Sequence, residues 1–316
     1  MDEPKRIISL LSSATEIIFG IGGQSRLAAV SHECDYPPAA SQLPRATRSL
    51  IDSSRESQQI DEQVAQRSAE GLPLYELDPE LIRRLRPGLI VTQAQCDVCA
   101  IRYADVIDLV QGDSDLASTE VLAISPSSLR DVLDDVTRIG QAAGLQHGAA
   151  AFRQSLERRI DAIASRTRGL SDAARPRVAC IEWTEPLMLA ANWTPELIEL
   201  AGGRPGLAQP NQHSTYALWS DLVAYDPEVL LISPCGFDLT RSLREAALLQ
   251  SRPGWSELSA VRSGRTWVID GNAYLNRSGP RLVDSLEIVA HLIQPQLFDR
   301  PAWSDPKSLP WTRLEA

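Results

Sequence analysis

The sequence predicts an α/β protein with two Rossmann-like lobes, each built on a mostly parallel sheet, joined by one long α-helix. The chain has 316 residues, a length that suits two domains. Short apolar runs alternate with helical stretches, as they do in parallel sheets. One uninterrupted helical pattern lies near the middle of the chain. We therefore place the first lobe at residues 1–145, the linking helix at 146–170, and the second lobe, with a Pro-rich tail, at 171–316.

The first lobe opens with a continuous apolar run, Arg6–Leu11, typical of a strand buried on both faces. A helix follows at residues 17–21, with Ser13 or Thr15 as its candidate N-cap, and Gly22-Gly23 ends it. Asp78-Pro79 is expected to start another helix, with Asp at the N-cap and Pro at the first turn. The other elements expected in this lobe are strands at 27–30, 88–92 and 121–124 and helices at 60–70, 99–110 and 126–143.

The second lobe repeats this order, which indicates two similar units. Thr194-Pro195 begins a helix that Gly202-Gly203 ends, as Gly22-Gly23 ends the first. Asp226-Pro227, before an apolar run, resembles Asp78-Pro79. The expected strands are 177–182, 229–233 and 265–270, and a helix at 280–293 closes the lobe.

The linking helix is predicted from its pattern. Phe152, Leu156, Ile160 and Ile163 follow the spacing of one helical face, and no Pro interrupts the run. The Arg and Glu residues between 153 and 168 are expected to form its solvated faces. Such a helix holds two lobes at a defined separation, whereas a Gly/Ser linker would not.

Composition excludes several classes of function. The formal net charge of −10 has the wrong sign for a chain that neutralises nucleic-acid phosphates, so we expect no nucleic-acid partner. No apolar run approaches the roughly 18 residues that span a bilayer, so we expect no membrane insertion. The N-terminus is too acidic and its apolar stretch too short for a secretory leader, which predicts a cytoplasmic protein, or a periplasmic one if a leader has been removed. Because no motif of hydrolytic catalysis is present, we expect no enzyme activity.

Four segments carry a resemblance to a known family. They are Arg6–Ile17, Ser31–Pro37, Leu85–Gln93 and Asp270–Arg281. They resemble cobalamin-binding substrate-binding proteins, which belong to the superfamily of Fe(III)-siderophore and vitamin B12 periplasmic binding proteins (class III, with a helical backbone). The resemblance covers residues 6–295.

The resemblance implies two α/β lobes joined by one helix, and binding without catalysis of a corrinoid, cobalamin foremost, in a cleft between them. It also implies transport through an ABC transporter permease. The acidic residue that members present to the permease has no counterpart near Ala100–Arg102, so binding is better supported than delivery. Members of the superfamily bind different chelates on one scaffold, so a siderophore or haem stays open as ligand.

Ligands of doubly wound sheets bind beyond the carboxyl ends of the strands. A corrin ring has broad apolar faces and a fringe of amides, so its site needs flat aromatic contacts and hydrogen-bonding groups. The alternatives to a ligand site are that Ser12 caps a helix and that the aromatic residues pack within a lobe. The expected wall residues are Ser12, Tyr36, Gln95, Trp183, Tyr216, Asn272 and Tyr274.

A second hypothesis concerns cysteines. Cys96 and Cys99 form a C-x-x-C pair at an expected helix start, and His32 and Cys34 lie on a loop expected to be adjacent. These four side chains suit a tetrahedral Zn site or an iron–sulfur cluster, and hence a cytoplasmic metal or redox protein. Redox-active thiols, a disulfide and simple packing stay open. The remaining expectations are a buried Cys180, a buried Cys235, a structural role for His291, and Trp303 and Trp311 packed on the surface of a lobe.

Overall fold

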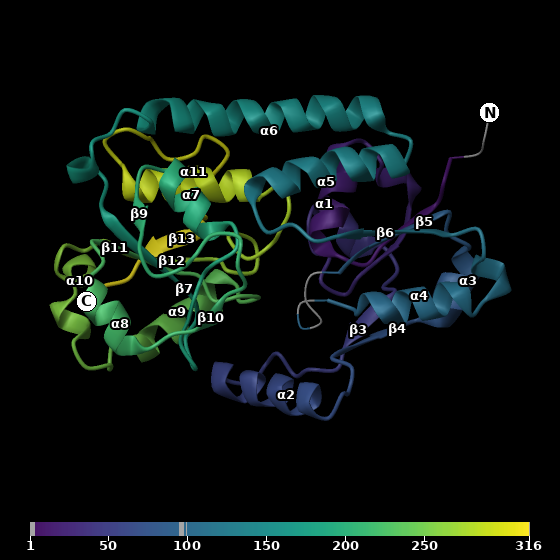
Figure 1. Ribbon diagram of the computed structural model, residues 1–316, viewed down its shortest axis with the longest axis horizontal. Helices are drawn as coiled ribbons and strands as arrows, with labels where there is room; N and C mark the ends of the chain where they lie inside the picture. Colours follow the sequence, from purple (N-terminus) through teal and green to yellow (C-terminus); the bar gives the residue numbers. More distant parts are fainter. Residues whose placement is uncertain (1–3, 95–97, 99, 316) are drawn as a thin grey trace. The chain divides into compact units, whose positions relative to one another are not determined.

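The computed structural model describes residues 4–94, 98 and 100–315, and the predicted α/β fold is confirmed (Figure 1). The chain divides into two compact units. Unit 1 comprises the chain up to Pro126 together with Arg130–Ser155, and unit 2 comprises Ser127–Leu129 together with Leu156–Ala316.

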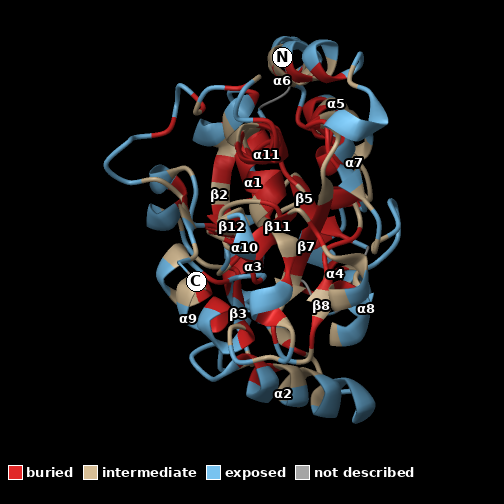
Figure 2. Cartoon of the chain, turned by 90° about the vertical axis from the view of Figure 1, so that its left-hand side faces the viewer, coloured by how far each residue is buried: buried red, intermediate tan, exposed pale blue. Residues whose placement is uncertain are grey.

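The sheet of unit 1 has four parallel strands in the order β2-β1-β5-β6. Every residue of β1 and β5 is buried, which explains why their sequences are continuous apolar runs without polar alternation. Figure 2 shows the buried strand β5 in red. The strands span Ile7–Ser9 (β1), Leu27–Val30 (β2), Leu89–Gln93 (β5) and Glu120–Ile124 (β6).

Two capping predictions for unit 1 have different outcomes. Asp78 caps helix α3 as predicted, because its carboxylate accepts a hydrogen bond from the backbone N–H of Leu81 at 2.9 Å. The N-cap predicted at Ser13 or Thr15 is wrong: α1 begins at Ser12, and its N-cap residue Leu11 makes no side-chain cap. The Thr15 hydroxyl instead donates to Ser9 Oγ at 2.8 Å, in the core. The helices are α1 (Ser12–Gly20), α3 (Pro79–Leu85), α4 (Tyr103–Gln111) and α5 (Leu129–Ala142).

Between β2 and β5 the chain forms an excursion, in which the helix predicted at 60–70 is confirmed and two short strands were not predicted. Strands β3 (Thr47–Ser49) and β4 (Tyr75–Leu77) pair antiparallel as a separate two-stranded sheet. Helix α2 (Ser57–Ala69) lies between them, and only its residues Ser57 and Ile60 are buried. The helix therefore adds little to the core of unit 1.

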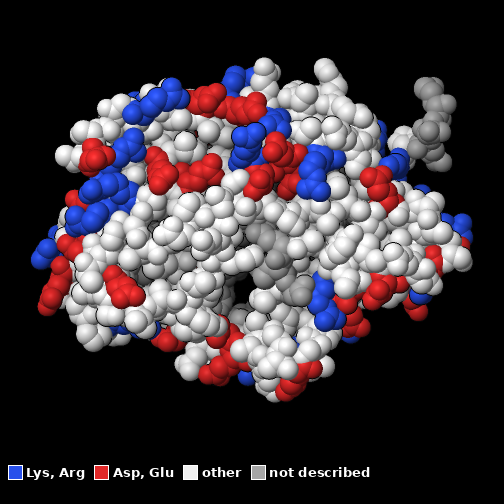
Figure 3. Space-filling model, viewed as in Figure 1, with Lys and Arg blue, Asp and Glu red and all other residues white. Residues whose placement is uncertain are grey.

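Helix α6 (Gln146–Thr167) begins in unit 1 and continues into unit 2. Leu156 and Ile163 are buried, as the predicted apolar face requires. Gly148 passes so close to the carbonyl oxygen of Ile21 that a Cβ atom at this position would overlap it. Figure 3 shows basic and acidic side chains over α6, in agreement with the solvated faces predicted there.

The sheet of unit 2 is mixed. Strands β7, β11 and β12 are parallel neighbours at its centre, and β9 also pairs parallel with β7. Strands β8 and β10 extend one side antiparallel, and β13 closes the other side antiparallel to β12. The strands are β7 (Arg177–Trp183), β8 (Met188–Leu189), β9 (Arg204–Pro205), β10 (Thr215–Tyr216), β11 (Val229–Ile232), β12 (Thr266–Ile269) and β13 (Trp311–Arg313).

The predicted likeness of Asp226-Pro227 to Asp78-Pro79 is wrong. Asp78 begins a helix, whereas Asp226 ends one, with a left-handed φ of 47°. Its counterpart in unit 1 is Arg86, which ends α3 with a φ of 46° and also precedes a proline and a strand. The helices of unit 2, besides α6, are α7 (Thr194–Leu200), α8 (Trp219–Tyr225), α9 (Leu239–Leu249), α10 (Ser259–Arg262) and α11 (Leu282–Ile293). Within the described ranges, no helix combines the length and hydropathy that crossing a bilayer requires.

The tail is built into unit 2. Trp311 lies in β13 opposite Ile269 and is only 3% exposed, so its predicted position on the surface is wrong. Trp303 is 41% exposed and does pack on the surface of the unit, against Tyr274. His291 has the structural role expected of it, because its Nδ1 lies 3.0 Å from the carbonyl oxygen of Phe298. All seven tryptophans of the chain belong to unit 2.

Candidate functional site

Three loops of unit 2 meet at the carboxyl ends of β7, β11 and β12. The backbone N–H of Cys235 donates to the carbonyl of Glu182 at 3.0 Å, which joins the loop after β11 to the end of β7. The N–H of Asn272 donates to the carbonyl of Phe237 at 2.9 Å, and Asn276 Nδ2 donates to the carbonyl of Ser233 at 2.8 Å. The loop after β12 is thereby fixed to the loop after β11. These contacts bring the predicted residues Trp183 and Asn272 to one edge of the sheet.

Trp183 is one end of an apolar row at this edge. Its indole N–H donates to the carbonyl of Glu185 at 3.1 Å, so its ring face is the part left for other contacts. Met188 of β8 is the register partner of both Trp183 and Tyr216. Directly opposed residues of antiparallel strands project to the same face of a sheet, so the three side chains form a row. Tyr216 is 62% exposed and Trp183 is partly exposed.

An ion pair with a buried glutamate supports Trp183 through Phe237. The Trp183 ring lies 5.1 Å from that of Phe237, and the guanidinium carbon of Arg241 lies 4.5 Å from the Phe237 ring. Arg241 pairs at 2.8 Å with Glu245, which is 1% exposed and also accepts from the Thr184 hydroxyl at 2.7 Å. Because Thr184 follows Trp183 in the chain, these contacts form a closed cycle. The cycle fixes the orientation of the Trp183 and Phe237 side chains.

The loop at residues 270–281 supplies polar groups. Asn272 Oδ1 accepts a hydrogen bond from Arg277 at 2.7 Å. Asp270 accepts the backbone N–H groups of Asn272 and Ala273 at 3.0 and 2.9 Å, and burial raises the pKa of its carboxyl group. Amide and guanidinium groups therefore lie on the same loop as Tyr274.

In unit 1 the predicted wall residues follow two adjacent strands. Ser12 is the first residue of α1 and is partly buried, and Tyr36 lies in the loop after β2 and is 45% exposed. Strands β1 and β2 are parallel neighbours, so both residues follow the same edge of the sheet. Gln95 lies outside the described residues.

His32 and Cys34 have separate partners. His32 Nδ1 lies 2.8 Å from Thr47 Oγ1, and its Nε2 lies 3.3 Å from a Glu33 carboxylate oxygen. The Cys34 thiol is buried 3.1 Å from Thr15 Oγ1, and burial raises its pKa, which favours the neutral thiol over the thiolate that metals bind. In the part of the chain that the structure describes, no three His, Cys, Asp or Glu side chains are grouped to hold a metal ion.

The other two predicted ligands, Cys96 and Cys99, lie outside the described residues. The four-residue metal site therefore stays a prediction.

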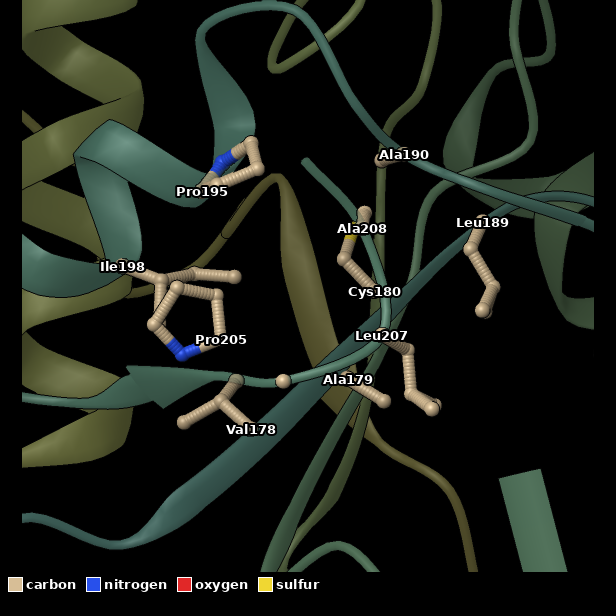
Figure 4. Close-up of a pocket in the computed structure, with 11 residues that line it drawn as sticks. Val178, Ala179, Cys180, Leu189, Ala190, Pro195, Ile198, Pro205, Leu207 and Ala208 are labelled. Atoms are coloured by element: carbon tan, nitrogen blue, oxygen red, sulfur yellow. The ribbon is translucent and has the colours of Figure 1, made fainter. Parts of the chain in front are cut away.

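A small recess lies elsewhere in unit 2, between β7, α7 and the segment 205–208. Figure 4 shows apolar side chains around it, among them Val178, Cys180 and Pro205. Its empty volume of about 230 Å³ includes space open to solvent, so the enclosed part is far below the roughly 300–1,000 Å³ of sites that enclose a small ligand. It is too small for a tetrapyrrole.

Sequence reasoning missed several residues of the site. Phe237, Arg241 and Met188 were not singled out, although Phe237 follows the strand at 229–232 closely enough for the rule on strand ends to include it. The predicted burial of Cys180 is confirmed, whereas the predicted burial of Cys235 is wrong, because its loop turns this side chain outward. Trp193, another strand-end aromatic, is buried and donates to the carbonyl of Leu275, so it is unavailable as a wall residue.

The sequence also matches a known protein family. The family model for periplasmic binding proteins matches residues 7–273. The chain belongs to this family. Membership of this family implies a small-molecule ligand.

Individual relatives are distant. A cobalamin-binding protein of Halobacterium salinarum is 26% identical over 293 residues, which cover 92% of this chain and 69% of the relative. The periplasmic vitamin B12 binding protein of Vibrio cholerae has a TM-score of 0.64 at 20% identity, over 92% of this chain and 98% of that one. A periplasmic heme-binding protein of Pseudomonas aeruginosa has a TM-score of 0.67 at 23% identity, over 99% of both chains. The two structures establish the likeness of fold.

Proposed function

We propose that this periplasmic binding protein binds a corrinoid, with cobalamin as the leading candidate, and delivers it to an ABC transporter without converting it. The observation that carries the proposal is the row of Trp183, Met188 and Tyr216 at the carboxyl edge of the unit 2 sheet. A flat apolar surface suits the face of a corrin ring. The halobacterial relative, named as a cobalamin-binding protein, supports the choice of ligand.

The polar groups beside the row suit the rim of the same ligand. Asn272 and Arg277 are joined by a hydrogen bond of 2.7 Å and lie on a loop attached to Phe237. Amide and guanidinium donors match the carbonyl oxygens of the amide side chains that fringe a corrin. Ser12, Tyr36 and Gln95 remain proposed wall residues on the side of unit 1.

A titration tests the proposal. Purified protein is titrated with cyanocobalamin, and binding is followed by calorimetry and by quenching of tryptophan fluorescence. We expect saturable binding, recovery of the ligand chemically unchanged, and about tenfold weaker binding for Trp183→Ala, the size of one aromatic stacking contact. Trp219→Ala is the matched control, because Trp219 also stacks on an aromatic ring, that of Trp255, but lies outside the row.

The same titration with haemin and with a ferric siderophore separates the other chelates. Structural relatives include heme-binding proteins, so haem is the principal competitor. Tighter binding of haemin than of cyanocobalamin would replace the corrinoid by a porphyrin as ligand. Absence of binding to all three chelates would contradict the proposal.

A metal or iron–sulfur protein built on His32, Cys34, Cys96 and Cys99 is the alternative that the sequence raised. Elemental analysis and a visible spectrum of anaerobically purified protein test it. Stoichiometric Zn or Fe that is lost from Cys96→Ser would support this function, and metal-free protein would contradict it.

A further inference from the structure

A charged network fixes the position of Trp303, a residue of the tail. The Trp303 indole N–H donates to Glu287 Oε2 at 2.5 Å. The Glu287 carboxylate also accepts two hydrogen bonds from Arg159, both at 2.8 Å, and Arg159 donates to Asp284 at 2.5 Å. Arg159 belongs to α6, whereas Asp284 and Glu287 lie one turn apart on α11. The tail is thus attached to two helices of unit 2 through one indole.

The ring of Trp303 makes a second contact. It stacks on Tyr274 with a centroid separation of 5.7 Å and an interplanar angle of 17°. The guanidinium carbon of Arg281 lies 5.8 Å from the centroid of the Tyr274 ring, and Arg281 is only 8% exposed. Tyr274 is therefore held by one aromatic and one cationic neighbour.

Tyr274 is placed to control the shape of the loop at residues 270–281. At one end Asp270 accepts backbone N–H groups, and further along Asn276 donates to the carbonyl of Ser233. Tyr274 lies between these two fixed points, and its side chain contacts the tail. Trp303 is 41% exposed, yet both its N–H and its ring have partners, so its place on the surface is specific.

We propose that Trp303 is a positioning residue, which holds Tyr274 and with it the loop at 270–281 in the conformation that binds ligand. This inference rests on the proposed function, because Asn272 and Arg277 of the same loop are proposed ligand contacts. Through Glu287 and Arg159 the same residue connects the ligand loop to α6.

The test compares Trp303→Ala with Trp303→Phe by titration of each full chain with cyanocobalamin. Removing the ring is expected to weaken binding about tenfold, whereas phenylalanine retains a stacking surface and is expected to stay within about threefold of the natural chain. Trp219→Ala, which also removes a stacked tryptophan with a bonded N–H, is expected to bind like the natural chain. Unchanged binding by Trp303→Ala would overturn the proposal. Equal weakening in all three variants would also overturn it, since general destabilisation would then explain the loss.

A measurement without ligand separates this inference from the proposed function. The six tyrosines are labelled with 3-fluorotyrosine, and Tyr274→Phe identifies the ¹⁹F signal of Tyr274. We expect that signal to move in Trp303→Ala, because the ring current of the indole is lost, and to stay in place in Trp219→Ala. If the natural chain binds no chelate, the proposed function fails and the ¹⁹F spectrum decides the positioning role. An unmoved Tyr274 signal in Trp303→Ala would refute that role.

Discussion

Removal of the Glu245 carboxylate should destabilise unit 2 strongly. Glu245 is 1% exposed and pairs at 2.8 Å with Arg241, whose side chain is 15% exposed. Glu245→Ala removes the carboxylate that pairs with this guanidinium and accepts from the Thr184 hydroxyl. Breaking a buried ion pair on one side costs about 3 to 5 kcal/mol. Because Arg241 keeps its contact with Phe237 and some exposure to water, we expect about 3 kcal/mol, at the lower end.

The assay is urea unfolding followed by tryptophan fluorescence, which reports on unit 2 because all seven tryptophans lie there. Glu245→Gln keeps an oxygen acceptor and loses only the charge, so its loss should be about 1 to 2 kcal/mol. Glu199→Ala is the control, an exposed glutamate on α7, expected within about 0.5 kcal/mol of the natural chain. A loss below about 1 kcal/mol for Glu245→Ala would refute the reasoning that this pair is a buried, stabilising support of the aromatic site.

Three further predictions concern unit 1. Burial raises the pKa of Asp135 to about 6, so the free energy of unfolding should rise as pH falls from 7 toward 4. Asp135→Asn should abolish this dependence and, at pH 7.5, stabilise by up to about 3 kcal/mol in urea melts followed by circular dichroism, because unit 1 has no tryptophan. Arg86→Gly should raise stability by about 0.5 to 1 kcal/mol in the same melts, because glycine adopts the φ of 46° without strain; a loss would contradict this. Gly148→Ala should cost about 1 to 3 kcal/mol, since its methyl group overlaps the Ile21 carbonyl, and a gain in thermal stability would show that α6 shifts freely.

The fold could be predicted where the sequence pattern of an element is local and strong. The central parallel strands are buried on both faces, so each appears as a continuous apolar run. Strand β11 lies within the range predicted for it, and β5 is shifted by one residue from the predicted range of 88–92. Short antiparallel strands such as β8, β10 and β13 escaped prediction, because two or three residues carry no periodicity and their pairing is set by distant segments. The Asp-Pro pairs show the same limit, since one dipeptide begins a helix at Asp78 and ends one at Asp226.

Only the location of the candidate site, at the carboxyl ends of strands, could be predicted. Trp183 and Asn272 were expected because they follow strands of a doubly wound sheet, and the structure brings their loops together. Phe237 and Arg241 were missed, because their link to Trp183 is a contact between segments more than fifty residues apart in the printed sequence. The outward turn of Cys235 was missed because residue type alone favours burial of cysteine.

The polar helix α2 has a practical consequence. It lies in the chain between β2 and β5, outside the four-stranded sheet, and only its residues Ser57 and Ile60 are buried. A dye or a surface tether attached to its outer face should therefore leave the four-stranded sheet undisturbed. That face is a suitable anchoring point for immobilising the protein on a sensor chip, with the loops of unit 2 chemically unmodified.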